Sequence, residues 1–316
     1  LGDVYKRQLP ALVNQLGFVY ATSSFPKNGL AIQEAIPDLE ELATDVVDTY
    51  LLPGPVILAG ASEGGAITAL AVERSDVFGG GLALCGPVGG FQQQINHYGH
   101  FRVIFDYFFP GILPGTAIDP DPEGLAGPLY PPVRAYWDTW YVPRIAAALQ
   151  AYPGATAQLL KVTGIKTDPA DPVTSIGEAV VGNLWYNVFA TYDAVETLGG
   201  QPFDNLWKWY RGSSNDFRLN LRVPRYRADY AARLEIAANY ETSGQIHVPV
   251  VTAHTTGDPI VPYWHEPVYR FKTWRAGNGR LHTNLPVFRY GHCDFTANEA
   301  VTAFAILLAK IQAQAP

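Results

Sequence analysis

A serine lies between glycines at the junction of a strand pattern and a helix pattern. Residues 56–59 form a continuous apolar run, which is typical of a strand buried on both faces of a parallel sheet. The turn Gly60-Ala61-Ser62-Glu63-Gly64-Gly65 follows, and a helix pattern continues to residue 74. Because such a strand-to-helix turn is tight, side chains beside the serine would clash, and glycine avoids the clash. The pattern therefore predicts that Ser62 stands clear of the sheet, at the positive end of the helix, as a nucleophile.

Other segments repeat the alternation of strand and helix. Short apolar runs with turns on either side favour strands, and amphipathic stretches favour helices. The predicted strands are residues 18–22, 56–59, 81–84, 247–254 and 285–290, and the predicted helices are residues 9–16, 38–51, 63–74, 264–275 and 298–311. Strands that alternate with helices predict an α/β fold with a doubly wound, mostly parallel sheet.

The alternation disappears over residues 95–244. Five of the seven tryptophans lie there, and proline and glycine cluster at residues 110–132 between stretches of helical pattern. We therefore expect a core made of residues 1–94 and 245–316, and a large, mostly helical cap at 95–244. Most cap aromatics are expected to pack inside the cap, and a few to line a pocket at the sheet's C-terminal edge.

A serine hydroxyl needs a base, and the base needs an orienting carboxylate. Asp258 directly follows a predicted strand, and His292 follows the last predicted strand just before the final helix. The chain order Ser62, Asp258, His292 is the order that this kind of site requires. His254 and His265 are the rival bases, but neither follows the last strand. The backbone N–H of Glu63 is expected to be one oxyanion donor.

Together these motifs resemble the α/β-hydrolase superfamily over residues 9–94 and 245–316. The resemblance rests on GASEGG at 60–65, GDPIVP at 257–262 and GHC at 291–293. It implies that Ser62 is the nucleophile, His292 the general base and then the general acid, and Asp258 the residue that orients His292. Gly60, Gly64 and Gly65 match the small positions of the family's serine turn.

The His-Cys pair at 292–293 is also similar to tannases and feruloyl esterases. In those enzymes the cysteine after the histidine bridges a cysteine just before the nucleophile. Position 61 is alanine here, so a bridge from Cys293 would have to use Cys85. The favoured interpretation of the two cysteines is that both are small buried apolar residues.

The start of the chain is unusual. The sequence contains no methionine, and residues 3–8 match the translation of an adaptor used in sequencing libraries. We therefore expect residues 1–8 to be foreign to the protein, and the first strands of the sheet to lie upstream. The loop that supplies the second oxyanion donor would lie upstream with them.

Composition and motifs indicate which partners and cofactors the protein is not expected to bind. A net charge of −7 argues against nucleic acid as a partner. No apolar run reaches the roughly eighteen residues of a membrane span. No motif for a metal, nucleotide or other cofactor is present, so neither a metal nor a cofactor is expected. Compartment and oligomeric state stay open.

The sequence therefore predicts a serine esterase that cleaves a small-molecule carboxylic ester through an acyl-enzyme. The aromatic-rich cap favours a substrate with an apolar or aromatic group. One alternative is a peptidase or acyltransferase with the same three residues. The other is a hydrolase-like binding protein without activity.

Overall fold

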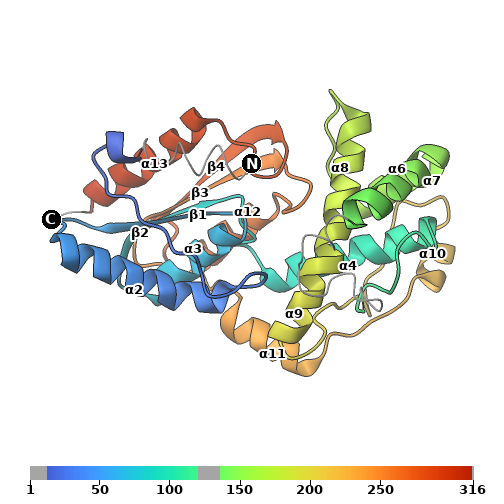
Figure 1. Cartoon of the computed structure of the whole chain (residues 1–316), viewed down its shortest axis with the longest axis horizontal. Helices are drawn as coiled ribbons and strands as arrows, with labels where there is room; N and C mark the ends of the chain where they lie inside the picture. Colours follow the sequence, from blue (N-terminus) through green and yellow to red (C-terminus); the bar gives the residue numbers. More distant parts are fainter. Residues whose placement is uncertain (1–12, 120–135, 315–316) are drawn as a thin grey trace.

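Four parallel strands form one sheet in the order β1-β2-β3-β4 (Figure 1). The computed structural model describes residues 13–119 and 136–314. The strands are β1 (Val56–Ala61), β2 (Phe78–Leu84), β3 (Val250–Gly257) and β4 (His282–Tyr290). This sheet, with helices between the strands, confirms the predicted α/β class.

Helices cover both faces of the sheet (Figure 1). On one face, α3 packs against β1 and β2, and α2 packs on α3; on the other, α13 packs against β2 and β3. The fourth core helix, α12, contacts β4. These helices are α2 (Ile32–Tyr50), α3 (Glu63–Arg74), α12 (His265–Arg275) and α13 (Ala297–Gln312). The sheet is therefore doubly wound.

Glycines in β2 let the two helical layers approach closely. A Cβ atom added to Gly80 would lie 2.7 Å from Ile311 Cδ1 of α13. On the opposite face, a Cβ on Gly81 would lie 3.1 Å from Val72 Cγ1 of α3. The absence of side chains at Gly80 and Gly81 thus allows the close packing of the layers around the middle of the sheet.

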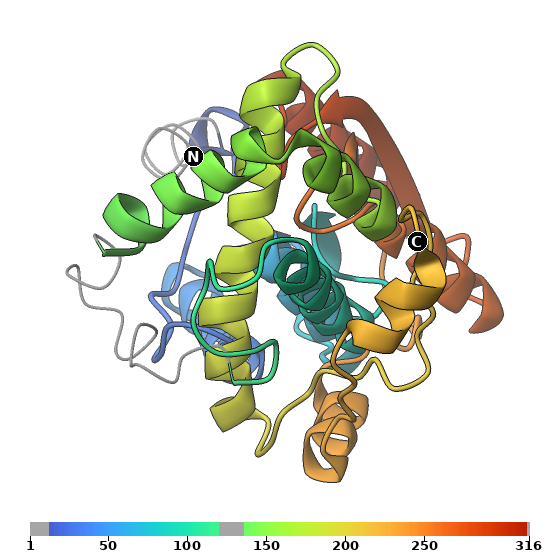
Figure 2. The same ribbon diagram turned by 90° about the vertical axis from the view of Figure 1, so that its right-hand side faces the viewer.

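Most of the remaining described helices form a second group that shares a second hydrophobic core within residues 95–244, the helical region. Large side chains such as Phe105, Trp137 and Leu159 are fully buried there. Figure 2 views this group face on, with α8, η2 and α9 forming one long yellow-green helix. The elements are α4 (Phe91–Phe108), η1 (Trp137–Tyr141), α6 (Val142–Ala151), α7 (Pro153–Thr163), α8 (Pro172–Trp185), η2 (Tyr186–Ala190), α9 (Thr191–Thr197), α10 (Asp216–Arg222) and α11 (Tyr230–Asn239). The buried residues Ala194, Ala232 and Ile236 of the helical region instead pack into the core around α2 and α3.

The helical group faces the carboxyl ends of the strands. The hydroxyl of Tyr290, the last residue of β4, donates to the Ser175 carbonyl of α8 at 3.1 Å. A small apolar cluster of Tyr98 from α4 with Ile260 and Val261 from the loop after β3 also joins the two parts. Loops at that edge of the sheet therefore lie between core and helical region.

The predicted strand at residues 18–22 is wrong, because the chain there forms no regular structure. The ring of Phe18 instead packs edge-on against Phe304 of α13, with ring centroids 5.2 Å apart. A strand needs a neighbour to satisfy its backbone groups. Residues 18–22 do not pair with β1, which forms one edge of the sheet among the described residues. The expectations for residues 1–8 and 9–12 lie outside the described residues.

The predicted core elements from residue 38 onward are all present. The helix at 63–74 has the predicted ends, and the others have shifted ends. The second helix begins at Ile32 rather than at residue 38, because Ile32, Ala35 and Ile36 add a buried apolar face to it. The strand predicted at 247–254 is β3, which begins at Val250 and continues to Gly257.

The glycines of the serine turn have unequal steric roles, and this gives a test. A Cβ on Gly60 would lie 2.1 Å from the backbone oxygen of Gly64, whereas a Cβ on Gly64 meets nothing within 4 Å. We expect Gly60→Ala to lower the free energy of unfolding by about 1–3 kcal/mol or more, because backbone has to move. Thermal unfolding measures the loss.

Gly64→Ala is the matched control. It should leave the melting temperature unchanged or raise it, since alanine favours a helix over glycine by about 1 kcal/mol. Equal destabilisation by the two substitutions would contradict this steric account of the turn.

Candidate active site

Ser62 occupies the tight turn between β1 and α3. Its backbone has φ 58° and ψ −123°, a conformation that L-residues rarely adopt. The turn is held by the Ser62 N–H, which donates to the Leu84 carbonyl of β2 at 2.9 Å. The Glu63 N–H opens α3 and has no acceptor within the helix. Serine hydroxyl and free N–H thus lie side by side at the helix N-terminus.

The structure brings Ser62, Asp258 and His292 together. His292 Nε2 lies 2.9 Å from Ser62 Oγ, and His292 Nδ1 lies 2.7 Å from Asp258 Oδ2. These distances fit a neutral imidazole that accepts from the serine hydroxyl and donates to the carboxylate. The three side chains come from the ends of β1, β3 and β4, so the parallel sheet aligns them at one edge.

Asp258 is buried and fully hydrogen-bonded. Its side chain is inaccessible to solvent, and its Oδ1 accepts from the N–H groups of Ile260 and Val261 at 2.8 and 2.9 Å. Burial alone would raise the pKa of Asp258. Hydrogen bonds from His254 and His292 and their charges outweigh burial, so its pKa lies below the usual range. Asp258 is therefore ionised at neutral pH.

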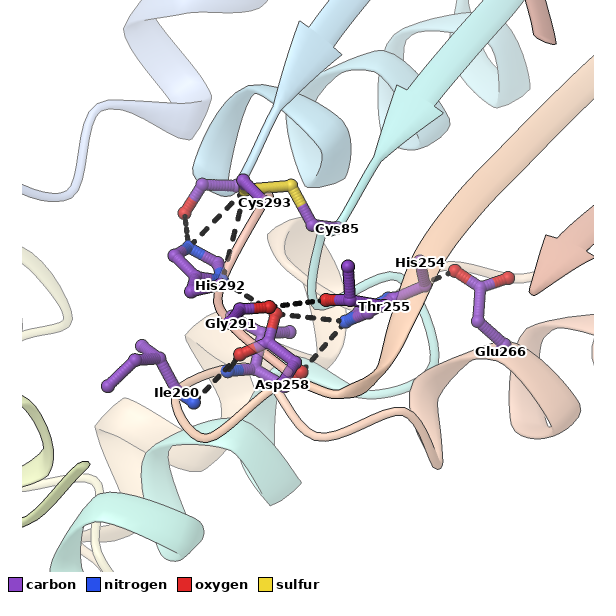
Figure 3. The surroundings of a disulfide bond; sticks show 11 residues. Cys85, His254, Thr255, Asp258, Ile260, Glu266, Gly291, His292 and Cys293 are labelled. Atoms are coloured by element: carbon purple, nitrogen blue, oxygen red, sulfur yellow. Dashed lines mark hydrogen bonds and ion pairs between the residues drawn. A yellow bond between two sulfur atoms is a disulfide. The ribbon is translucent and has the colours of Figure 1, made fainter. Parts of the chain in front are cut away.

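Cys85 and Cys293 form a disulfide, so the interpretation of both as unpaired buried residues is wrong (Figure 3). Their Cα atoms are 5.3 Å apart, although the residues are 208 positions apart in the sequence. The bond links the end of β2 to the residue beside His292. A second link comes from Thr255, whose hydroxyl donates to the Gly291 carbonyl at 2.5 Å. The loop that carries His292 is thus held from both sides.

The two rival histidines hydrogen-bond elsewhere. His254 lies on the other side of Asp258, with Nε2 3.3 Å from Asp258 Oδ2. His265 accepts from the Gly89 N–H at 3.1 Å and donates to Gln94 Oε1 at 2.8 Å. Of the three candidate bases, His292 is therefore the one hydrogen-bonded to Ser62.

The side chain of Glu63 is engaged away from the serine. Its Oε1 accepts from the Ala31 N–H at 2.9 Å, and burial raises the pKa of its carboxyl. This bond ties the start of α2 to the serine turn. Only the backbone N–H of Glu63 is available for the role predicted for this residue.

Sequence reasoning missed Tyr186. This residue opens the π-helix η2 in the helical region, and its hydroxyl interacts with the side chain of Ser62. Its ring stacks on Tyr98 with centroids 5.0 Å apart and planes 8° apart. Burial, followed by the charges of Asp258 and Glu63, raises its pKa, so the hydroxyl is protonated at neutral pH. π-Helical turns are frequent at functional sites, but the sequence marks Tyr186 only as one of many aromatics.

One group of potential metal ligands lies at this site in the described part of the chain. Atoms of Cys85, His292 and Cys293 lie within 4.8 Å of one another. Both sulfurs are in the disulfide, so neither can act as a thiolate ligand. The arrangement suits proton transfer and nucleophilic attack rather than metal binding.

Among the described residues, no helix combines the length and apolar character needed to cross a membrane.

Comparison with known proteins gives distant structural similarities. No family model and no curated protein matches the chain. A monoacylglycerol lipase from Paleococcus ferrophilus is 15% identical, with 99% of this chain and 91% of that chain covered and a TM-score of 0.42. The esterase LipA from Xanthomonas oryzae is 15% identical, with coverages of 94% and 67% and a TM-score of 0.37.

The acylaminoacyl peptidase from Pyrococcus horikoshii is 10% identical, with a TM-score of 0.37. The match covers 82% of this chain, which spans only 24% of the peptidase. The assignment of the fold class rests on the topology of the sheet and the position of Ser62, not on these similarities. A parallel, doubly wound sheet with a serine in a strand–turn–helix junction and a helical insertion fits the α/β-hydrolase fold.

Proposed function

We propose that this chain is a serine hydrolase that cleaves carboxylic esters through an acyl-enzyme. The observation that carries the proposal is the continuous hydrogen-bonded chain from Ser62 through His292 to Asp258. Such a chain activates a serine hydroxyl that is otherwise a poor nucleophile. Ser62, His292 and Asp258 are thus proposed as nucleophile, base and orienting acid.

In the first half-reaction, Ser62 Oγ attacks the ester carbonyl while its proton passes to His292 Nε2. Asp258 stabilises the imidazolium that forms, and His292 returns the proton to the departing alcohol. In the second half-reaction, His292 takes a proton from water, which attacks the acyl-enzyme and releases the acid. Ser62 recovers its proton at the end, so the protein is unchanged.

The negative oxygen of each tetrahedral intermediate needs hydrogen-bond donors. The Glu63 N–H supplies one, at the positive end of α3. We propose the Tyr186 hydroxyl as a second, because it is protonated and interacts with the Ser62 side chain. This donor comes from the helical region, whereas the sequence predicts a donor from a loop upstream of residue 9.

We further propose that residues 95–244 act as a cap that shapes the substrate site. Tyr98, Ile260 and Val261 are buried in one cluster with Tyr186 packed against it. Tyr186 supports the proposal, because it packs on this cluster and its hydroxyl interacts with Ser62. The cluster supports an ester with an apolar or aromatic group as substrate.

Hydrolysis kinetics test the proposal. We expect Ser62→Ala and His292→Ala to lower kcat by several powers of ten, because each removes a group that reacts. Asp258→Asn should cost about 10⁴-fold, since it leaves the geometry but presents the wrong partner to His292. A panel of p-nitrophenyl esters, feruloyl esters and aminoacyl amides provides the substrates and separates esterase from peptidase activity.

Ser75→Ala is the matched control, because Ser75 caps the far end of the same helix. It should keep full activity. Esterase activity near that of the wild type in Ser62→Ala would exclude the proposed function.

Tyr186→Phe tests the second donor separately. Loss of one oxyanion donor costs roughly 10²–10³ in kcat. We expect a loss of this order with a nearly unchanged KM, since the ring and its stacking remain. Steady-state kinetics on the best ester of the panel measure both constants.

Tyr98→Phe is the control, because it keeps the stacked ring and removes a hydroxyl that interacts with Gln94 rather than with Ser62. An unchanged kcat in Tyr186→Phe, or equal losses in the two variants, would show that Tyr186 serves packing alone.

A further inference from the structure

A second histidine lies behind the proposed triad. His254 is on β3, fully buried, and contacts Asp258 from the side opposite to His292 (Figure 3). Its Nε2 lies 2.8 Å from the Val261 carbonyl oxygen and 3.3 Å from Asp258 Oδ2. Its Nδ1 lies 3.2 Å from Glu266 Oε1 of α12. Asp258 is thus shared between two imidazoles.

The partners of His254 indicate its protonation state. A backbone carbonyl only accepts, so Nε2 carries a proton. Nδ1 faces Glu266, whose other oxygen already accepts from Thr252 and Asn284, each at 2.5 Å. A carboxylate held by these donors accepts from Nδ1 as well. Burial lowers the pKa of His254, but the hydrogen bonds and charges of Asp258 and Glu266 outweigh burial and raise it to about 9.

Three other titratable groups near His254 are uncharged at neutral pH. Burial lowers the pKa of His265 on α12 well below its usual value, and that of His282 on β4 to about 4. Tyr263, whose ring lies 5.9 Å from that of His254, has a raised pKa and is neutral. One cation therefore lies between two buried carboxylates, with His292 beyond Asp258.

We propose that His254 is a buried imidazolium that acts as a positioning residue for the triad: it holds Asp258 ionised and in place, and it opposes premature protonation of His292. Without this cation, no positive charge would balance the negative charges of the buried carboxylates of Asp258 and Glu266. A proton on His292 is then more favourable in the resting protein, and a protonated His292 cannot accept from Ser62. His254 thus extends the pH range in which the enzyme is active toward lower pH.

This inference rests on the proposed function. It is therefore tested by one measurement that needs enzymatic activity and one that does not. The first is the pH dependence of kcat/KM for ester hydrolysis. In His254→Gln, the pH of half-maximal activity on the acid side should rise by about one unit. His265→Gln is the matched control: it removes a buried, neutral histidine that hydrogen-bonds to Gly89 and Gln94, and it should leave that pH unchanged.

The second measurement does not need activity and uses the unaltered protein. Nuclear magnetic resonance of ¹⁵N-histidine-labelled protein should show one imidazole protonated on both nitrogens at pH 7.5, with titration near pH 9. The signal should be missing in His254→Gln and present in His265→Gln.

The outcomes separate the two claims. Absence of hydrolysis and of labelling by a fluorophosphonate would end the proposed function, while the ring-proton spectrum would still decide the charge on His254. A His254 that is singly protonated at pH 7.5 overturns the inference. So does an active His254→Gln variant whose acid-side midpoint stays in place.

Discussion

The rest of the site depends on the hydrogen bonds that the buried carboxylate of Asp258 accepts. This carboxylate accepts from two backbone N–H groups of its own loop and contacts one histidine on each side. An ionised carboxylate without these partners would cost several kcal/mol to bury. Strand β3, the loop that follows it and the loop after β4 must therefore lie where these donors converge on Asp258.

Covalent and hydrogen-bonded links hold the histidine loop at that place. The disulfide joins Cys293 to Cys85 at the end of β2, and Thr255 bonds to Gly291. Cys293 itself has φ 54°, a conformation that a free loop would seldom keep. The imidazole of His292 is thus oriented by bonds on both sides before any substrate binds, which is the preorganisation that acyl transfer requires.

The sequence predicts the sheet and the three side chains that hydrogen-bond in the site, because each is marked by a pattern in the residues next to it. A continuous apolar run, a glycine turn and a helix pattern lie next to Ser62, and chain order places Asp258 and His292. Long-range features leave no such pattern. The Cys85–Cys293 pair depends on a distance of 5.3 Å across 208 positions. The roles proposed for Tyr186 and His254 depend on neighbours from other elements, and residues 18–22 lack the partner that a strand needs.

The central claim is that Ser62 is the one activated nucleophile of this protein. Reaction with a fluorophosphonate, followed by proteolysis and mass spectrometry of the peptides, tests it most directly. The account predicts a single stoichiometric adduct on Ser62, formed fast in the unaltered protein and lost when His292 is replaced by alanine. An adduct on another residue, or an Ser62 adduct that forms equally fast without His292, would contradict it.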